Sequence, residues 1–158
     1  MAFTKKTIKD VPLEHKTVLL RADYNVPFKD GKISDDYRVV QSLPTLKFLI
    51  KAKCKIVIIA HLGRPKGKVV KELSLEPVAE HLSKLLDRKV TFVQDCVGDR
   101  VKVAVKQAKP GDVILLQNVR FHEGDEANDP KFAKQLADSS QAAYFVQDGF
   151  GVGHRAHA

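Results

Sequence analysis

The sequence predicts an α/β fold in which a mostly parallel sheet has helices on both faces. Two observations predict it. Short, continuous apolar runs recur along the 158 residues, and segments with helical spacing separate them. Strands that are buried on both faces of a parallel sheet have such continuous runs, and no antiparallel hairpin is indicated between them. The regular alternation therefore favours one three-layer, Rossmann-like domain.

The first 68 residues predict a strand–helix–strand unit. Its elements are a strand at 17–22, a loop at 23–34, a helix at about 35–50, a strand at 55–60 and a loop at 61–68. The strands are the runs TVLLRA and KIVIIA, which suit a buried sheet. Asp30-Gly31 indicates a turn. Ser34 or Asp35 is expected to cap the helix, and Pro44 indicates either a kink or the first turn of a second helical piece.

The alternation continues through the rest of the chain. The expected elements are a helix at 75–86, a strand at 90–93, a helix at 98–108, a strand at 113–116, a loop at 118–129, a helix at 130–139 and a strand at 142–146. Asp129 and Pro130 are expected to cap and begin the last helix. A glycine-rich segment follows the last strand.

Charge and composition exclude several classes of protein. The formal net charge of +8 predicts an anionic partner. A nucleic-acid-binding domain is the weaker interpretation, because the lysines are scattered without interleaved aromatic residues and no recognition motif is present. The apolar runs are far shorter than the roughly 18 residues of a membrane span, and no signal peptide is predicted. Cys54 and Cys96 have no metal or redox spacing and are interpreted as reduced thiols of a cytoplasmic protein.

Polar and basic residues follow four of the predicted strands. The segments are RADYN at 21–25, HLGRP at 61–65, NVRFH at 118–122 and DGFGVGHRAH at 148–157. Ligands of parallel sheets bind at the carboxyl ends of the strands. Arginine makes bidentate bonds to phosphate or carboxylate and keeps its charge. The four segments therefore predict a site for a small ligand with several negative charges.

Motifs for a nucleotide or a metal ion are absent. GRPKGK at 63–68 has three residues between its glycines instead of four, and Val69 stands where a phosphate-binding loop has Ser or Thr. GFGVGH at 149–154 has a histidine at the third glycine position. His154 and His157 have a metal-like spacing, but no acidic or cysteine partner is close in sequence, so no metal ligand is predicted.

Four segments together resemble a known family. RADYNVP at 21–27, HLGRP at 61–65, LLQNVRFH at 115–122 and DGFGVGHRAHA at 148–158 are similar to segments of the phosphoglycerate kinases, in that family's order and spacing. The resemblance implies a two-domain glycolytic kinase in which the N-terminal domain binds 3-phosphoglycerate and the C-terminal domain binds Mg-ATP or Mg-ADP. Residues 1–158 are then the N-terminal substrate-binding domain, and the nucleotide-binding domain is absent from this chain.

The resemblance also implies roles for single residues. Asp23 and Asn25 match residues that bind the hydroxyl and carboxylate end of 3-phosphoglycerate. Arg38 matches an arginine that stabilises the phosphoryl group during transfer, and it is the expected catalytic residue. A basic cluster for the substrate's phosphate and carboxylate is expected from His61, Arg64, Arg120 and Arg155. The full substrate-binding set is Asp23, Tyr24, Asn25, Arg38, His61, Leu62, Gly63, Arg64, Arg120 and Arg155.

Some positions depart from the family pattern. Gln117 stands where Glu is usual, and Gln147, Gly149, Val152 and Gly153 replace Asn, Ala, Thr and Ala. The added glycines are expected to loosen the loop that presents Arg155.

The function implied by the resemblance is reversible phosphoryl transfer between 1,3-bisphosphoglycerate and ADP, by a cytoplasmic monomer without nucleic-acid or membrane partners. This chain alone is expected to bind substrate without turnover. A stand-alone anion-binding regulatory module is the alternative, and the reading frame after Ala158 distinguishes the two.

Overall fold

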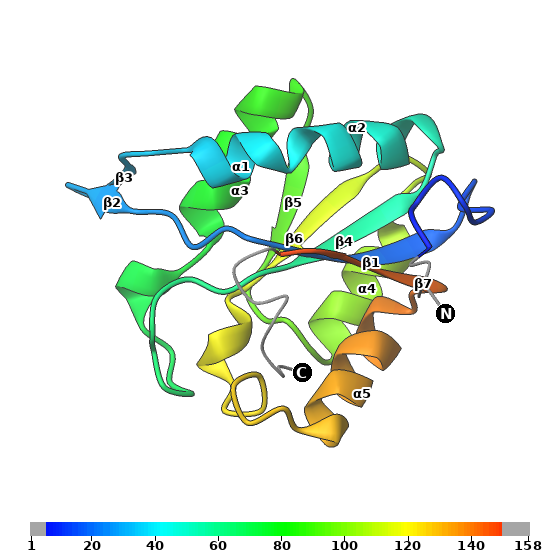
Figure 1. The fold of residues 1–158 in the computed structure, drawn as a ribbon. Coiled ribbons are helices and arrows are strands. Elements are labelled where there is room, and N and C mark those ends of the chain that lie inside the picture. The colour runs from blue at the N-terminus through cyan, green and yellow to red at the C-terminus, as the bar shows by residue number, and fades with distance from the viewer. Residues whose placement is uncertain (1–5, 150–158) are drawn as a thin grey trace, which may run out of the picture.

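A five-stranded parallel sheet forms the centre of the protein. The computed structural model describes residues 6–149. The strands are β1 (Thr17–Ala22), β4 (Lys55–Ile59), β5 (Val90–Val93), β6 (Val113–Leu116) and β7 (Tyr144–Asp148), in the spatial order β5-β6-β4-β1-β7. Every neighbouring pair is parallel (Figure 1). The predicted α/β class is thereby confirmed.

Helices cover both faces of this sheet. One face, at the top of Figure 1, carries α1 (Tyr37–Gln41), α2 (Leu43–Lys51) and α3 (Glu76–Leu86). The other face carries α4 (Asp99–Gln107) and α5 (Pro130–Ser140). Two short 3-10 helices, η1 (Lys71–Leu73) and η2 (Val119–Phe121), lie in the loops. Within residues 6–149, no helix combines the length and the apolar character that a bilayer crossing requires.

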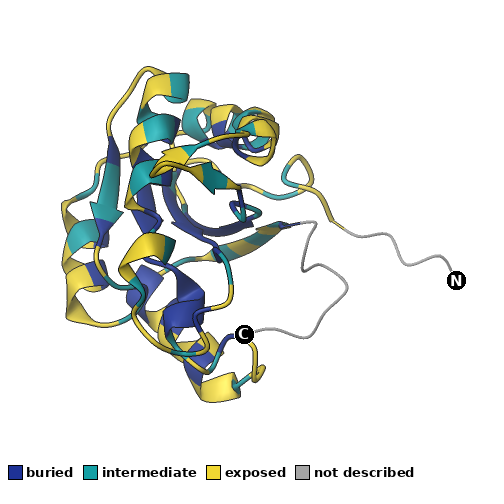
Figure 2. Ribbon diagram, turned by 90° about the vertical axis from the view of Figure 1, so that its left-hand side faces the viewer, coloured by how far each residue is buried: buried dark blue, intermediate teal, exposed yellow. Residues whose placement is uncertain are grey.

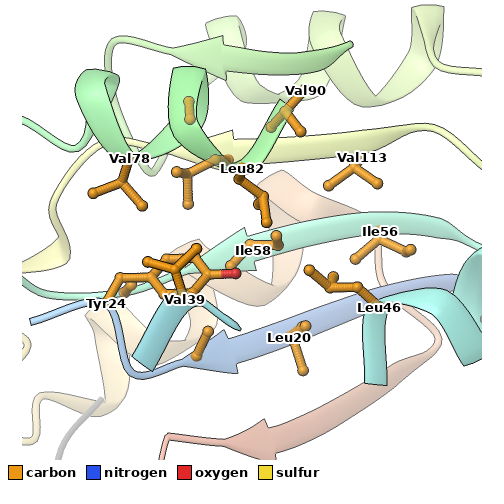
Figure 3. Close-up of a cluster of buried hydrophobic side chains, with 14 of the residues drawn as sticks. Leu20, Tyr24, Val39, Leu46, Ile56, Ile58, Val78, Leu82, Val90 and Val113 are labelled. Carbon is orange, nitrogen blue, oxygen red and sulfur yellow. The ribbon is translucent and has the colours of Figure 1, made fainter. Parts of the chain in front are cut away.

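Alternate side chains of the central strands enter two separate cores. In β4, Ile56 and Ile58 face the core beneath α1–α3, whereas Val57 and Ile59 face the core above α4 and α5. All four are at most 1% exposed. The dark blue strands in Figure 2 lie between the two helical layers, and Figure 3 shows side chains of the first core. Burial on both faces explains why β4 has a continuous apolar run.

The helix predicted at 35–50 is in fact two helices. They meet at Ser42, and Pro44 lies in the first turn of α2, which is one of the two predicted arrangements. Asp35 Oδ1 accepts a hydrogen bond from the Tyr37 backbone N–H at 2.9 Å, although Asp36 is the N-cap residue.

The last helix and strand also follow the prediction closely. Asp129 caps α5 and accepts a bond from the Lys131 N–H at 2.9 Å. Gln141 ends α5 in the left-handed region, at φ 55°. The chain needs two further residues to reach the sheet, so β7 begins two positions later than predicted.

A small hairpin contradicts the expectation of no antiparallel pairing. Strands β2 (Phe28–Lys29) and β3 (Lys32–Ile33) pair antiparallel. Asp30 and Gly31 connect them with positive φ values of 52° and 75°, which suit the twist of a two-residue hairpin turn. The turn was predicted but the hairpin was not, because two-residue strands are too short to show alternating hydrophobicity.

Candidate functional site

The sheet order brings the four predicted segments to neighbouring positions. β6, β4, β1 and β7 are consecutive in the sheet, and their carboxyl ends lie at one edge because the strands are parallel. The segment after β7 lies within the described residues only as far as Gly149. Arg155, which the sequence predicts as a ligand, lies outside them.

Gly63 connects the loops that follow β1, β4 and β6. Its N–H donates to Asn25 Oδ1 at 2.9 Å, and its carbonyl accepts a bond from Arg120 Nη1 at 3.1 Å. Its φ is +64°, and an added Cβ would lie 2.7 Å from Leu73 Cδ2. A side chain would be strained by this backbone conformation and would require Leu73 to move. Three predicted residues from three loops are therefore in direct contact.

Asn118 holds the loop after β4 against the loop after β6. Its Nδ2 donates to the carbonyls of Leu62 and Leu73, at 2.7 and 3.0 Å. Its Oδ1 accepts bonds from the backbone N–H groups of Leu62 and Arg120, at 3.3 and 3.0 Å. The side chain is fully buried, so all of its hydrogen-bonding capacity serves to position these two loops.

Arg38 reaches from α1 to the loop after β1. Its Nη1 donates to Asp23 Oδ1 at 3.2 Å and to the Asn25 carbonyl at 2.9 Å. The Arg38 side chain is 48% exposed. A ligand in solution can therefore reach a guanidinium group that two bonds already hold in place.

A pocket of 490 Å³ lies beside Arg38. Its lining residues are Asp23, Tyr37, Arg38, Gln41, Ser42 and Asp148. Burial raises the pKa of Asp148, and a side-chain hydrogen bond from Thr45 opposes this effect. The pocket thus places one guanidinium beside two carboxyl groups. Sequence reasoning assigned no role to Gln41, Ser42 or Asp148; the position of Asp148 at a strand end was the one available signal.

Two other arginines at this edge form a buried ion cluster, consisting of Arg21, Arg120 and Asp125. Arg21 Nη1 lies 2.7 Å from Asp125 Oδ1, and Arg120 Nε lies 3.6 Å from Asp125 Oδ2. Glu126 Oε1 is a further 3.5 Å from Arg120 Nε. The three cluster residues are at most 5% exposed. Sequence reasoning missed Asp125, because nothing distinguishes it from the other acidic residues of its loop.

The other predicted residues differ in exposure. Tyr24 is fully buried, with its hydroxyl 2.9 Å from Ser42 Oγ, and burial raises its pKa. Leu62 and His61 are also buried. Tyr24 therefore exposes no surface to a ligand, and Leu62 exposes almost none. Arg64, next to Gly63, is exposed.

The chain is similar to known proteins along almost its whole length. A family model described as phosphoglycerate kinase matches residues 8–158. The phosphoglycerate kinase of Moorella thermoacetica is 50% identical over 154 residues, and that of Pelotomaculum thermopropionicum is 47% identical over 154 residues. Both alignments cover 98% of this chain, which spans 39% of the length of each relative.

Solved structures give the same result. The structure of phosphoglycerate kinase from Coxiella burnetii matches with a TM-score of 0.82 and 41% identity, over 95% of this chain and 36% of that chain. The phosphoglycerate kinase of Pyrococcus horikoshii OT3 matches with a TM-score of 0.84 and 34% identity, over 95% of this chain and 38% of that chain. The chain therefore belongs to the phosphoglycerate kinase family and matches its N-terminal part.

Proposed function

We propose that residues 1–158 are the 3-phosphoglycerate-binding domain of a two-domain phosphoglycerate kinase. The whole enzyme transfers a phosphoryl group reversibly between 1,3-bisphosphoglycerate and ADP, giving 3-phosphoglycerate and ATP in glycolysis and gluconeogenesis. One observation carries the proposal. The loops after β1, β4 and β6 are bonded into a single network through Gly63, and the guanidinium of Arg38 is anchored at its margin.

The network suits a ligand with a carboxylate, a hydroxyl and a phosphate. Asp23 accepts a bond from Arg38 at 3.2 Å, so the arginine offsets its negative charge. Asp23 can then accept a bond from the substrate hydroxyl without repelling the nearby carboxylate. Arg64 and Arg120, with His61 and Arg155, form the proposed cluster for the other charged groups.

Phosphoryl transfer requires mainly positioning and stabilisation of the charge on the transferred group. Arg38 supports that role because its guanidinium is both anchored and 48% exposed. The nucleotide substrate, Mg-ATP or Mg-ADP, is bound by a part of the enzyme outside this chain. Domain closure then brings the nucleotide in line with the acceptor carboxylate and excludes water. This chain alone binds substrate and transfers nothing.

We also propose that the protein binds a small anionic ligand, is cytoplasmic and monomeric, and has no nucleic-acid or membrane partner. Neither the family match nor the relatives described above support the alternative of a stand-alone regulatory module.

Calorimetric titration of the purified chain with 3-phosphoglycerate tests the proposal, with inorganic phosphate and an RNA oligomer as competing ligands. We expect saturable binding that prefers 3-phosphoglycerate. Arg64→Ala should weaken it. Arg88→Ala is the matched control, because Arg88 is exposed at the opposite edge of the sheet, where its Nη1 bonds the Gly111 carbonyl. Equal, weak binding of all small anions would contradict the proposal, and RNA binding with a steep salt dependence would indicate a nucleic-acid partner.

A further inference from the structure

A second cluster of reactive side chains lies at the β5–β6 side of the carboxyl edge. Asp95 and Cys96 follow β5, and His122 follows η2. Because β5 and β6 are adjacent parallel strands, the fold brings together residues that are 27 positions apart. One ligand atom from each side chain lies within 4.8 Å of the other two.

The fold holds the three side chains in place. His122 Nε2 lies 2.8 Å from Asp95 Oδ1, which also accepts a bond from the Cys96 backbone N–H at 2.7 Å. The His122 ring stacks on Phe132, with centroids 5.2 Å apart, and Phe132 is buried in the second core.

The cluster is closed on one side and open on the other. Cys96 is fully buried, whereas the side chains of Asp95 and His122 are 43% and 36% exposed. The thiol is therefore the buried member of the cluster, and Asp95 and His122 form its exposed side. A bound ion takes a water molecule as its fourth ligand from the exposed side.

We propose that Asp95, Cys96 and His122 bind a divalent transition-metal ion of the Zn²⁺ class. Thiolate and imidazole are ligands that Zn²⁺ and Co²⁺ accept readily, whereas Mg²⁺ and Ca²⁺ prefer oxygen ligands. Three protein ligands with an open fourth position give a tetrahedral site. None of these side chains belongs to the Gly63 network, so this inference does not depend on the proposed function.

The distances suit such an ion. Zn–S bonds of about 2.3 Å and Zn–N or Zn–O bonds of about 2.0–2.2 Å place tetrahedral ligand atoms roughly 3.2–3.7 Å apart. Ligand atoms that already lie within 4.8 Å of one another require only small side-chain rotations. The contact between Asp95 and His122 must lengthen by about half an ångström, because it is shorter than a tetrahedral edge.

Binding forms three coordinate bonds and releases the Cys96 thiol proton to solvent. Without the ion, burial and the neighbouring Asp95 carboxylate raise the pKa of Cys96, so the thiol keeps its proton. With the ion, thiolate and carboxylate together balance two positive charges, and the imidazole is neutral. The occupied site therefore carries no net charge at a partly buried position.

Co²⁺ is the best probe, because a thiolate–Co²⁺ bond produces an intense charge-transfer absorption. The 158-residue chain is stripped of metal with a chelator, titrated with Co²⁺ and then with Zn²⁺ as competitor. We expect a one-to-one complex with this absorption, which Zn²⁺ abolishes. Cys96→Ser should remove the absorption, and His122→Gln and Asp95→Asn should each weaken Co²⁺ binding at least about tenfold.

Two control variants make the test specific. Cys54→Ser should keep the absorption, because Cys54 is the chain's other buried cysteine and donates to the Leu13 carbonyl at 3.2 Å. The double variant His154→Gln/His157→Gln removes the other closely spaced histidines and should also keep it.

The proposal is overturned if the unmodified chain shows no charge-transfer absorption, or if the absorption survives in a folded Cys96→Ser variant. Unchanged Co²⁺ affinity in both His122→Gln and Asp95→Asn overturns it as well. Circular dichroism shows whether Cys96→Ser folds. If it does not fold, His122→Gln and Asp95→Asn still decide the test, because both side chains are partly exposed.

Discussion

The buried ion cluster and the exposed arginines lie at the same edge of the sheet but in opposite environments. In the cluster, Arg21 and Arg120 share the buried carboxylate of Asp125. Arg38 is nearly half exposed and Arg64 is exposed. An arginine at a strand end is therefore not an anion ligand by position alone. Burial and a shared buried carboxylate give Arg21 and Arg120 a structural role that the exposed Arg38 and Arg64 do not have.

Removal of Asp125 should have the largest effect. Asp125→Ala leaves two buried guanidinium groups without their shared carboxylate, and loss of one partner of a buried pair costs about 3–5 kcal/mol. We expect the free energy of unfolding to fall by that amount in urea denaturation, or the variant not to fold. Asp138→Ala is the control, because it removes only the exposed Lys134–Asp138 pair, worth less than about 0.5 kcal/mol. Equally small losses in both variants would contradict a structural role for the cluster.

Substitution of Arg38 should affect the reaction more than the fold. In the full-length enzyme, we expect Arg38→Ala to lower kcat by about 10²–10³-fold, as for other groups that stabilise developing charge. KM should change by less than about tenfold, and the free energy of unfolding should stay nearly constant. Steady-state kinetics with Arg88→Ala as control provides the measurement. If Arg38→Ala raises KM and leaves kcat unchanged, Arg38 contributes only to ground-state binding.

Arg64 and Arg120 sharpen the comparison, because one is exposed and the other is buried. A hydrogen bond to a charged group contributes about 1.5–3 kcal/mol, so Arg64→Ala should lower 3-phosphoglycerate affinity roughly tenfold or more without changing stability. Arg120→Ala should lower both quantities, since Arg120 also bonds the Gly63 carbonyl and pairs with Asp125. Calorimetry and urea denaturation on the same samples separate the two effects. Unchanged affinity in both variants would refute the basic cluster.

Local sequence predicts the sheet well, because a strand that is buried on both faces must be apolar throughout. KIVIIA predicts β4 for this reason, and its neighbours follow the same rule. The antiparallel hairpin could not be predicted, since β2 and β3 are stabilised by a turn and not by a hydrophobic face. The start of β7 was predicted too early, because the left-handed conformation of Gln141 leaves no signal in local hydrophobicity.

The candidate site was likewise predicted only in part. The position of the loops after β1 and β4 at the carboxyl ends of parallel strands predicts that Asp23, Asn25 and Gly63 lie at one edge. The hydrogen bonds from Gly63 to Asn25 and from Asn25 to Asp23 confirm it. Position at a strand end does not show that Arg21 is structural whereas Arg38 is accessible, because Asp125, the partner of Arg21, is 104 positions away in the sequence. Asp95 and His122 likewise meet only through strand pairing. Contacts of this kind depend on tertiary packing, which no local pattern encodes.

Asp148 should give the smallest effect, because it is only partly buried in the pocket beside Arg38. Burial raises the pKa of its carboxyl group above the ordinary value of 3.8, against the opposing bond from Thr45. The native state therefore holds this proton more tightly than the unfolded state does. The stability that this group contributes is fully present below pH 3.8 and is lost as the pH rises through the raised native pKa.

Asp148→Asn should remove this part of the pH dependence. Urea denaturation from acidic to neutral pH should show a smaller decline for Asp148→Asn than for the unmodified chain, and no such difference for the exposed control Asp138→Asn. An identical decline in the unmodified chain and Asp148→Asn would contradict the raised pKa.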